Sequence, residues 1–293
     1  MVKASIDIGT NTILLLIANV SGSNMDIIED HHKIARLGEG LDKSGFISDA
    51  AIERGRKILE YYSERMKVHK VENVGIVATS AMRDAKNSTE VKAIFEEIIQ
   101  TEIKVIVGDE EARLSFLGSI EDDEQNTVID IGGGSTEIIC GRGNDISDKI
   151  SLQTGAVRLS ERSNLFYPFS SESLNFADDE LNNLFEKVKD FQFGKIIAIA
   201  GTPNTLAQIC LGLKDYSREI LHNFKMTSED LDKVIEIIKS NPQQHLIDNF
   251  GVHPNRADII LGGALILQNL LEVSKKDEFT VSSNGLRFGV IKS

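Results

Sequence analysis

The sequence predicts an α/β protein composed of two related domains, and three observations support this prediction. Strand-like and helix-like segments alternate along the whole chain, as they do in α/β folds. A strand–turn–strand motif near the N-terminus returns 123 residues later, which indicates an internal repeat. The length of 293 residues suits two domains of ordinary size.

The first part of the chain predicts strands and helices in alternation. Ala4–Val20 is rich in β-branched and aliphatic residues, and it predicts two strands around a tight turn at GTNT. The apolar spacing of Ser48–Lys67 predicts a helix, with Ser48 as its N-cap. We further expect a loop at Ile34–Leu41, a strand at Val74–Ala78, a helix at Ser88–Gln100, a strand at Lys104–Val107, a helix beginning at Asp109 and a solvated acidic loop at Glu121–Glu124.

The second part opens on TVIDIGGGSTEIIC at Thr127–Cys140, which predicts a strand, a Gly-rich turn and a second strand. The remaining expected elements are helices at Asp178–Val188, Ser228–Lys239 and Pro254–Leu271, strands at Lys195–Ala200 and Phe279–Ser282, a helix-like stretch from Thr205 to Ile209, and a closing segment at Asn284–Lys292.

The internal repeat aligns SIDIGTNT at residues 5–12 with VIDIGGGS at residues 128–135. The alignment matches Asp7 with Asp130 and Thr12 with Ser135. Chance similarity between two ordinary strand turns is the alternative, but two such matches favour duplicated domains. We expect one domain over residues 1–119 and the other over residues 120–293, with a terminal helix at 285–293 joining the first domain.

Each Gly-rich turn suits the binding of an anion. Small residues allow a close approach of the backbone, and successive N–H groups can form an anion-binding nest. Asp7 and Asp130 stand at strand ends, where one or two carboxylates can hold a hydrated Mg²⁺. Two such turns that face each other would bind one phosphate chain from both sides. Two structural hairpins, each capped by an Asp, are the alternative for these motifs.

Composition and charge exclude several classes of protein. The net charge of −13 argues against general binding of nucleic acid or of a membrane surface. No apolar run reaches the length of a membrane span, and the first strand begins too close to Met1 for a signal peptide. With two cysteines, no disulfide framework is expected. A cytoplasmic protein is therefore the expectation.

Known catalytic and cofactor motifs are also missing from the sequence. There is no P-loop, no G-x-S-x-G and no H-E-x-x-H. The run Gly132, Gly133 and Gly134 contains the first two glycines of the dinucleotide fingerprint G-x-G-x-x-G, at positions 132 and 134. Glu137 stands where the third glycine of that fingerprint is required. A strand is also predicted where that fingerprint requires a helix.

These motifs resemble the exopolyphosphatase/guanosine pentaphosphate phosphohydrolase family, Ppx/GppA, of the actin, sugar-kinase and Hsp70 superfamily. VIDIGGGSTEI is similar to the family's second phosphate motif, and SIDIGTNTILLLI is similar to its first. Similar segments continue along nearly the whole chain: ATSAMRDAKN, GDEEARLSFLG, GAVRLSE, AGTPNTLA and SNGLRFG. The resemblance is to the short, two-domain form of the family. It implies two actin-like (ribonuclease H-like) domains with mixed sheets and an interdomain cleft.

The resemblance implies the hydrolysis of a terminal phosphate, with Mg²⁺ or Mn²⁺ as the cofactor. The expected substrates are inorganic polyphosphate or guanosine penta- or tetraphosphate, and a homodimer is the suggested oligomer. A kinase or ATPase of the same superfamily is one alternative, although no separate acceptor signature is found. A non-catalytic polyphosphate sensor is another.

The resemblance also implies roles for individual residues. A Glu at the start of the helix near residue 109 would be the general base, and its spacing to the Gly-rich turn favours Glu111 over Glu110. The macrodipole also favours acids at that position without any catalytic role. Glu137 would lie near the metal and the attacking water, and a solvated strand residue is its alternative.

The remaining candidates are ligands of phosphate and metal. Arg83 would clamp a phosphate, for which its fixed guanidinium fork is suited, although it could also be an ordinary surface residue. The substrate-binding set is Thr10, Asn11, Thr12, Arg83, Gly132, Gly133, Gly134, Ser135, Gly201 and Thr202. Its last two members precede a helix whose N-terminus could bind phosphate or simply form an N-cap turn. Asp7 and Asp130 would hold the metal.

Overall fold

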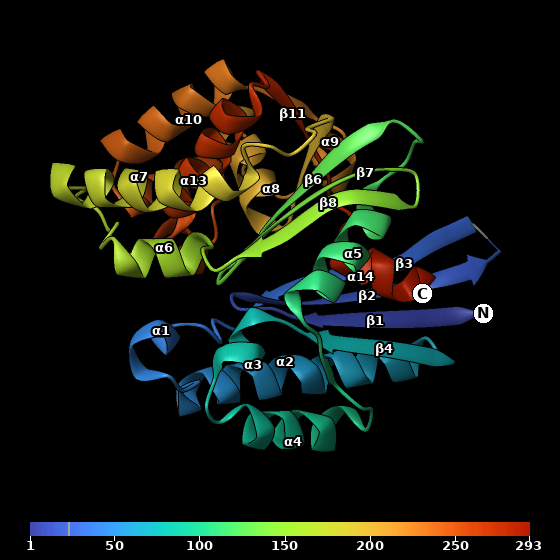
Figure 1. Cartoon of the computed structure of the whole chain (residues 1–293). Helices are drawn as coiled ribbons and strands as arrows, with labels where there is room; N and C mark the ends of the chain where they lie inside the picture. Colours follow the sequence, from blue (N-terminus) through green and yellow to red (C-terminus); the bar gives the residue numbers. More distant parts are fainter. Residues whose placement is uncertain (23) are drawn as a thin grey trace. The chain divides into compact units, whose positions relative to one another are not determined.

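The computed structural model describes residues 1–22 and 24–293 (Figure 1). The chain divides into two compact units. Unit 1 comprises residues 1–118 and 286–293, and unit 2 comprises residues 119–285. Each unit contains a mixed β-sheet with helices packed against it, so the predicted α/β class is confirmed.

Unit 1 is organised around a five-stranded sheet in the order β3-β2-β1-β4-β5. Its strands are β1 (Val2–Ile8), β2 (Thr12–Ser21), β3 (Asn24–Ile34), β4 (Asn73–Ala78) and β5 (Lys104–Val105). The three strands β1 to β3 are antiparallel neighbours, whereas β4 runs parallel to β1 and β5 parallel to β4. The hairpin predicted at residues 4–20 corresponds to β1 and β2.

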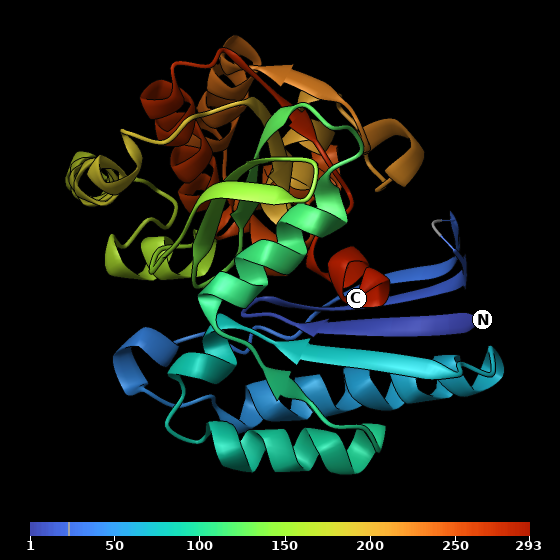
Figure 2. The ribbon, with the colours of Figure 1, turned by 45° about the vertical axis from the view of Figure 1, so that its right-hand side comes forward.

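Helices cover both faces of this sheet (Figure 2). They are α1 (Leu41–Ser44), α2 (Asp49–Val68), α3 (Ser80–Asp84), α4 (Ser88–Ile99), α5 (Gly108–Ser119) and α14 (Leu286–Lys292). The Ser48 side chain accepts a hydrogen bond from Ala51 N–H and caps α2, as the sequence predicts. Leu15 faces the core formed with α2 and α4, while the next residue, Leu16, packs against Phe288 of α14.

Unit 2 contains a six-stranded sheet in the order β10-β11-β9-β6-β7-β8. The strands are β6 (Gln125–Ile131), β7 (Thr136–Arg142), β8 (Asp145–Leu152), β9 (Lys195–Ile199), β10 (Lys225–Thr227) and β11 (Glu278–Val281). The strands β6 to β8 are antiparallel, and β9 runs parallel to β6.

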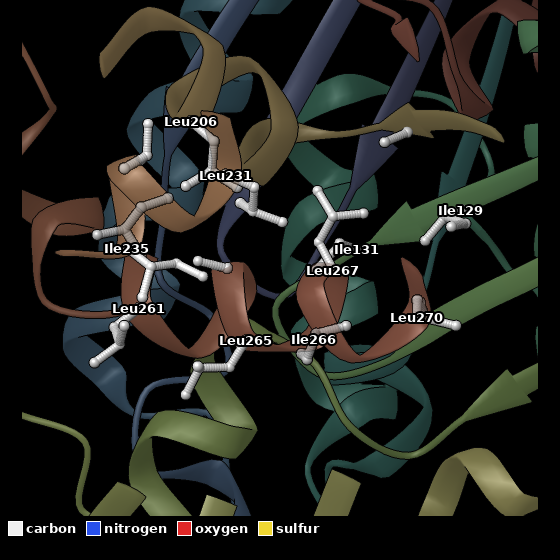
Figure 3. Packing of buried hydrophobic residues seen from close by; sticks show 14 of the residues in the cluster. Ile129, Ile131, Leu206, Leu231, Ile235, Leu261, Leu265, Ile266, Leu267 and Leu270 are labelled. Carbon is white, nitrogen blue, oxygen red and sulfur yellow. The ribbon is translucent and has the colours of Figure 1, made fainter. Parts of the chain in front are cut away.

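The helices of unit 2 build its main hydrophobic core. They are α6 (Ala156–Arg162), α7 (Ser171–Phe185), α8 (Gly201–Cys210), α9 (Arg218–Leu221), α10 (Ser228–Ser240), α11 (Gln243–Phe250), α12 (Pro254–Ala257) and α13 (Ile260–Ser274), with a 3₁₀ turn at Glu186–Val188. Figure 3 shows Leu265, Leu267 and Leu270 of α13 among the apolar side chains of β6 and α10. Because α13 is buried along most of its length, it supports the strand that leads into the second Gly-rich turn.

Several expected elements differ from the observed ones. The strands β3, β8 and β10 and the helices α1, α3, α6, α9 and α11 are not among the elements that the sequence predicts. The helix expected over Pro254–Leu271 is two helices, α12 and α13, separated at Asp258 and Ile259. The helix predicted at Asp178–Val188 begins earlier, at Ser171, and α8 begins at Gly201 rather than Thr205. The side chains of Asn204 and Thr205 donate to the carbonyls of Ala200 and Gly201 in this first turn.

The repeat in the sequence is also a repeat of backbone structure. The amide of Gly9 donates to the Thr12 carbonyl over 3.0 Å, and the amide of Gly132 donates to the Ser135 carbonyl over 3.0 Å. The register shifts once in each second hairpin, after Ile17 in unit 1 and after Cys140 in unit 2, again 123 residues apart. No helix in the described part of the chain has the length and apolar character needed to cross a bilayer.

Candidate active site

The loop that follows β3 holds the first Gly-rich turn, residues 9–12, through backbone hydrogen bonds. The amides of Ala35 and Arg36 donate to the Asn11 carbonyl over 3.0 and 2.9 Å, and the Gly38 amide donates to the Thr10 carbonyl over 2.9 Å. Gly38 is required by this close approach, since an added Cβ would lie 2.1 Å from Thr10 Cγ2. The loop therefore fixes the two carbonyls at the tip of the turn.

With these carbonyls engaged, the donors of the first turn remain available. Among the described residues, no acceptor bonds to the amides of Thr10 and Asn11. Within the same part of the chain, the buried Thr10 Oγ1 and Asn11 Oδ1 atoms also have no hydrogen-bond partner. Buried polar groups are normally satisfied, so the two available amides and the Thr10 hydroxyl are suited to donate to an external anion, whereas Asn11 Oδ1 can only accept a bond from a donor such as water.

The second Gly-rich turn, residues 132–135, is supported in a similar way by α6. The amide of Ala156 donates to the Gly132 carbonyl, and the amides of Val157 and Arg158 donate to the Gly133 carbonyl, over 2.9 to 3.0 Å. In the described residues, the amides of Gly133 and Gly134 have no acceptor. Both predicted phosphate turns thus have anchored carbonyls and available amides, which is the arrangement of an anion-binding nest.

Carboxylates lie directly beside the second turn. Asp130 on β6 is the register partner of Glu137 on β7, so their side chains lie on the same face of the sheet. Asp130 is 8% exposed and Glu137 is fully buried. Two neighbouring buried carboxylates are costly when both are ionised unless a cation or hydrogen-bond donors compensate. The predicted Asp7 holds the equivalent position in unit 1, at the end of β1.

A second pair of predicted residues comes together within unit 1. Arg83 of α3 donates from Nη1 to Glu111 Oε2 over 2.5 Å and to the Ile106 carbonyl over 3.0 Å. Its Nη2 atom is buried and has no hydrogen-bond partner among the described residues. Glu111 is 6% exposed, whereas Glu110 forms a solvent-accessible ion pair with Arg113. The two candidate bases therefore have different surroundings.

The N-terminus of α8 contains the predicted Gly201 and Thr202. Ala200, just before it, has a φ of 76°, a conformation that costs energy for a non-glycine residue. Arg256 donates from Nη1 to the Gly201 carbonyl and to Thr205 Oγ1, each over 3.1 Å. Burial lowers the pKa of Arg256 to about 10, so this residue is still a cation at neutral pH.

Three residues of these surroundings were not predicted from the sequence. Gly38 contacts the first turn of unit 1 and Arg256 contacts the start of α8 in unit 2, each from a segment far away in the chain. Ser151 donates from Oγ to Glu137 Oε1 over 2.6 Å. No motif marks any of the three, and only strand register could have indicated Ser151, once β8 was known.

The four predicted carboxylates are divided between the units. Asp7 and Glu111 belong to unit 1, and Asp130 and Glu137 belong to unit 2. Among the described residues, no group of three or more His, Cys, Asp or Glu side chains forms a ready metal cluster. Mg²⁺ usually takes only one or two carboxylates and keeps several waters, so the pair of Asp130 and Glu137 fits such an ion.

The similarity to known proteins extends over nearly the whole chain. Residues 16–293 match the family model described as the Ppx/GppA phosphatase family. A bifunctional 3-dehydroquinate synthase/phosphatase of Fusobacterium nucleatum is 35% identical over 99% of the chain, which spans 46% of that protein. Exopolyphosphatase 2 of Mycobacterium tuberculosis is 31% identical, with 99% of this chain and 97% of that protein covered.

Two further similarities concern a nucleotide hydrolase and a solved structure. A guanosine-5'-triphosphate,3'-diphosphate pyrophosphatase of Pseudoalteromonas atlantica is 30% identical over 98% of this chain and 57% of its own length. The crystal structure of a Ppx/GppA family member from Aquifex aeolicus has a TM-score of 0.83 and 32% identity. That match covers 99% of this chain and 96% of the Aquifex chain.

Proposed function

Because the chain belongs to the Ppx/GppA phosphatase family, we propose that it hydrolyses the terminal phosphoanhydride bond of inorganic polyphosphate or of a guanosine penta- or tetraphosphate. The observation that carries this proposal is the pair of matching turns, each with available amides beside a strand-end Asp. The relatives named exopolyphosphatase and guanosine-5'-triphosphate,3'-diphosphate pyrophosphatase support the two substrate classes.

In the proposed reaction, Glu111 accepts a proton from the attacking water. A carboxylate can act in this way when it lies about 2.6–3.2 Å from the water. The burial of Glu111 and its bond to Arg83 favour it over the half-buried Glu110, because the bond holds the Glu111 carboxylate in one orientation. Arg83 would also reach phosphate through Nη2, its remaining buried donor group.

The two turns and the start of α8 would bind phosphate oxygens by backbone amides and hydroxyls. In phosphoryl transfer to water, catalysis is mostly positioning and neutralisation of charge, so fixed amides are effective. Thr10, Asn11, Thr12 and Ser135 would add side-chain contacts, and Gly201 and Thr202 would add the helix N-terminus.

We assign Mg²⁺ or Mn²⁺ to the strand-end carboxylates Asp7 and Asp130, and within unit 2 Glu137 lies beside Asp130. The buried neighbours Asp130 and Glu137 support this assignment, because hard oxygen ligands in a low-dielectric setting favour a small divalent cation. When bound, the ion would offset the negative charge of the phosphate chain.

Measurement of phosphate release tests the proposal. The purified chain, with Mg²⁺, should release orthophosphate from polyphosphate or from guanosine pentaphosphate without any acceptor. Phosphate transfer from ATP to an added acceptor would instead indicate a kinase. Binding of polyphosphate with no phosphate release would indicate a sensor, and either result would overturn the hydrolase assignment.

The Glu111→Gln variant tests the role of the base. Gln keeps the size of the side chain but cannot accept the proton, so kcat should fall by about 10²–10⁴-fold while polyphosphate still binds. Glu110→Gln is the matched control, because it lies next to Glu111 on the same helix but pairs with Arg113 at the surface. A kcat that falls in the control and not in Glu111→Gln would transfer the role to Glu110.

A further inference from the structure

The two units differ where their repeated hairpins should be equivalent. In unit 2, Asp130, Glu137 and Ser151 are register partners across β6, β7 and β8. The corresponding row in unit 1 is Asp7, Leu14 and His32 across β1, β2 and β3. The carboxylate of Glu137 and the hydroxyl of Ser151 therefore occur together in unit 2 alone, although the two backbones share the same register.

The contact between these two side chains is short and partly buried. Ser151 Oγ donates to Glu137 Oε1 over 2.6 Å, which is the length of a hydrogen bond to an ionised carboxylate. Glu137 is fully buried, so this bond fixes one of its oxygens away from competing water. A glutamate has three side-chain torsions, and its carboxylate is placed by contacts of this kind rather than by the backbone.

We propose that Ser151 is a positioning residue, which holds the Glu137 carboxylate in the orientation needed for hydrolysis. This inference rests on the proposed function, in which Glu137 acts beside the metal and the water. Ser151 acts only through Glu137 and does not touch the substrate.

The segment that contains Ser151 also supports the second turn. Beyond Ser151, the Thr154 carbonyl accepts a bond from Thr136 Oγ1 over 2.8 Å. Gly155 then packs against the turn so closely that an added Cβ would lie 2.6 Å from the carbonyl carbon of Gly133. The end of β8 and the start of α6 therefore form one support for both the turn and Glu137.

Another serine of β8 provides a matched comparison. Ser147 bonds to the backbone carbonyl of Cys140 over 3.2 Å and to its neighbour Asp148 over 3.1 Å. It belongs to the same strand and contacts the same neighbouring strand, but it lies at the end away from the Gly-rich turn. Loss of its hydroxyl should affect the strand without affecting Glu137.

The experiment compares kcat and KM for phosphate release from polyphosphate. Removal of a residue that orients a site ligand typically costs about 10–100-fold, so Ser151→Ala should lower kcat by that factor, with KM changed less than about twofold. Ser151→Thr restores the hydroxyl and should recover most of kcat. Ser151→Val has nearly the same shape as Thr without the hydroxyl and should not recover it. Ser147→Ala should match the wild type.

A double-mutant cycle and melting temperatures separate positioning from general stability. In the Glu137→Gln background, Ser151→Ala should cause no further loss of kcat, because the group that it orients is already changed. Additive losses, or equal kcat in the Thr and Val variants, would overturn the proposal. A loss of kcat that follows a fall in melting temperature across all variants would show a structural role only. A wild-type chain that releases no phosphate would reject the proposed function itself.

Discussion

Gly38 lies outside the first Gly-rich turn, but it helps to determine the shape of that turn. Its amide holds the Thr10 carbonyl, and its missing side chain lets the backbone pass within van der Waals contact of the turn. The sequence places Gly38 in an expected loop at Ile34–Leu41, where nothing indicates this contact. The anion-binding geometry of the first turn therefore depends on a residue 26 positions beyond Thr12 in the chain.

Gly38→Ala should damage the first turn directly. The new Cβ would lie 2.1 Å from Thr10 Cγ2, so the Thr10 side chain, the loop or the turn must move. Overpacking of this kind costs about 1–3 kcal/mol of stability, and the moved amides should raise KM for polyphosphate. Gly40→Ala is the control: it strains a residue with a φ of 67° in the same loop, but its Cβ would meet no atom within 4 Å. Equal KM values for the two variants would contradict this account.

Among the elements, α14 shows how a short terminal helix is fixed to a sheet. Arg287 donates from Nε and Nη2 to both carboxylate oxygens of Asp30 on β3, over 3.0 and 2.9 Å. Its carbonyl accepts a bond from Ser5 Oγ on β1 over 2.7 Å. Because seven residues make a helix too short to be stable alone, these bonds and the packing of Phe288 hold it in place.

Asp30→Asn should destabilise the protein at neutral pH and much less in acid. Burial alone would raise the pKa of the Asp30 carboxyl, but the charge of Arg287 and the bond to His32 outweigh it and hold this pKa well below its usual range. A carboxyl of this kind stabilises the fold above its unfolded pKa, about 4, and loses that contribution as pH falls below it. Breaking a buried ion pair costs about 3–5 kcal/mol.

Urea unfolding at pH 7, 5 and 3 measures this difference in the free energy of unfolding between wild type and Asp30→Asn. The difference should be large at pH 7 and at pH 5 and should shrink at pH 3. Glu60→Gln removes an exposed ion pair with Arg56 and should change stability by less than about 1 kcal/mol at every pH. A difference for Asp30→Asn that does not depend on pH would show that the charge has no role.

An element or a site residue could be predicted from the sequence when its signal lay within one short segment of the chain. The hairpins and the helix after Ser48 could be predicted, because their strand periodicity and N-cap lie within short segments. The strands β3 and β8 could not, since they are edge strands that contain many polar residues and, apart from Leu152, only exposed or partly buried positions. The contacts Arg83–Glu111 and Ser151–Glu137 depend on register and packing between distant segments. The sequence therefore indicated Arg83, Glu111 and Glu137, which lie within motifs, but not Ser151.

For the whole molecule, the two units show a duplicated architecture with different chemistry. The strands β3-β2-β1-β4 of unit 1 correspond in order to β8-β7-β6-β9 of unit 2, and a bulge occurs at the equivalent position in each sheet. The two units therefore share one backbone arrangement in this region. The position occupied by Leu14 in unit 1 is occupied by Glu137 in unit 2. The acidic pair beside a turn therefore occurs in one unit only, which assigns the two turns different tasks in the proposed reaction.

The net charge of the whole chain makes a divalent cation central to the proposed activity. A protein at −13 repels a polyanion, and the residues proposed to act on it include the carboxylates Asp7 and Glu111 of unit 1 and Asp130 and Glu137 of unit 2. We therefore expect phosphate release to require Mg²⁺ or Mn²⁺ and to be abolished by EDTA. Activity should return when excess Mg²⁺ is added back. Full activity in EDTA would reject the metal assignment.

Asp130→Asn distinguishes a metal ligand from a residue that only caps the turn. An amide is a weaker ligand for Mg²⁺ than a carboxylate, so the variant should need a higher Mg²⁺ concentration for half-maximal rate. Its melting temperature should change little, because Asn keeps the shape of the side chain and leaves Glu137 as the one carboxyl group of this buried pair. A structural cap predicts the reverse, a lower melting temperature with an unaltered Mg²⁺ requirement. Both measurements on the same preparation, with wild type alongside, therefore decide which role Asp130 has.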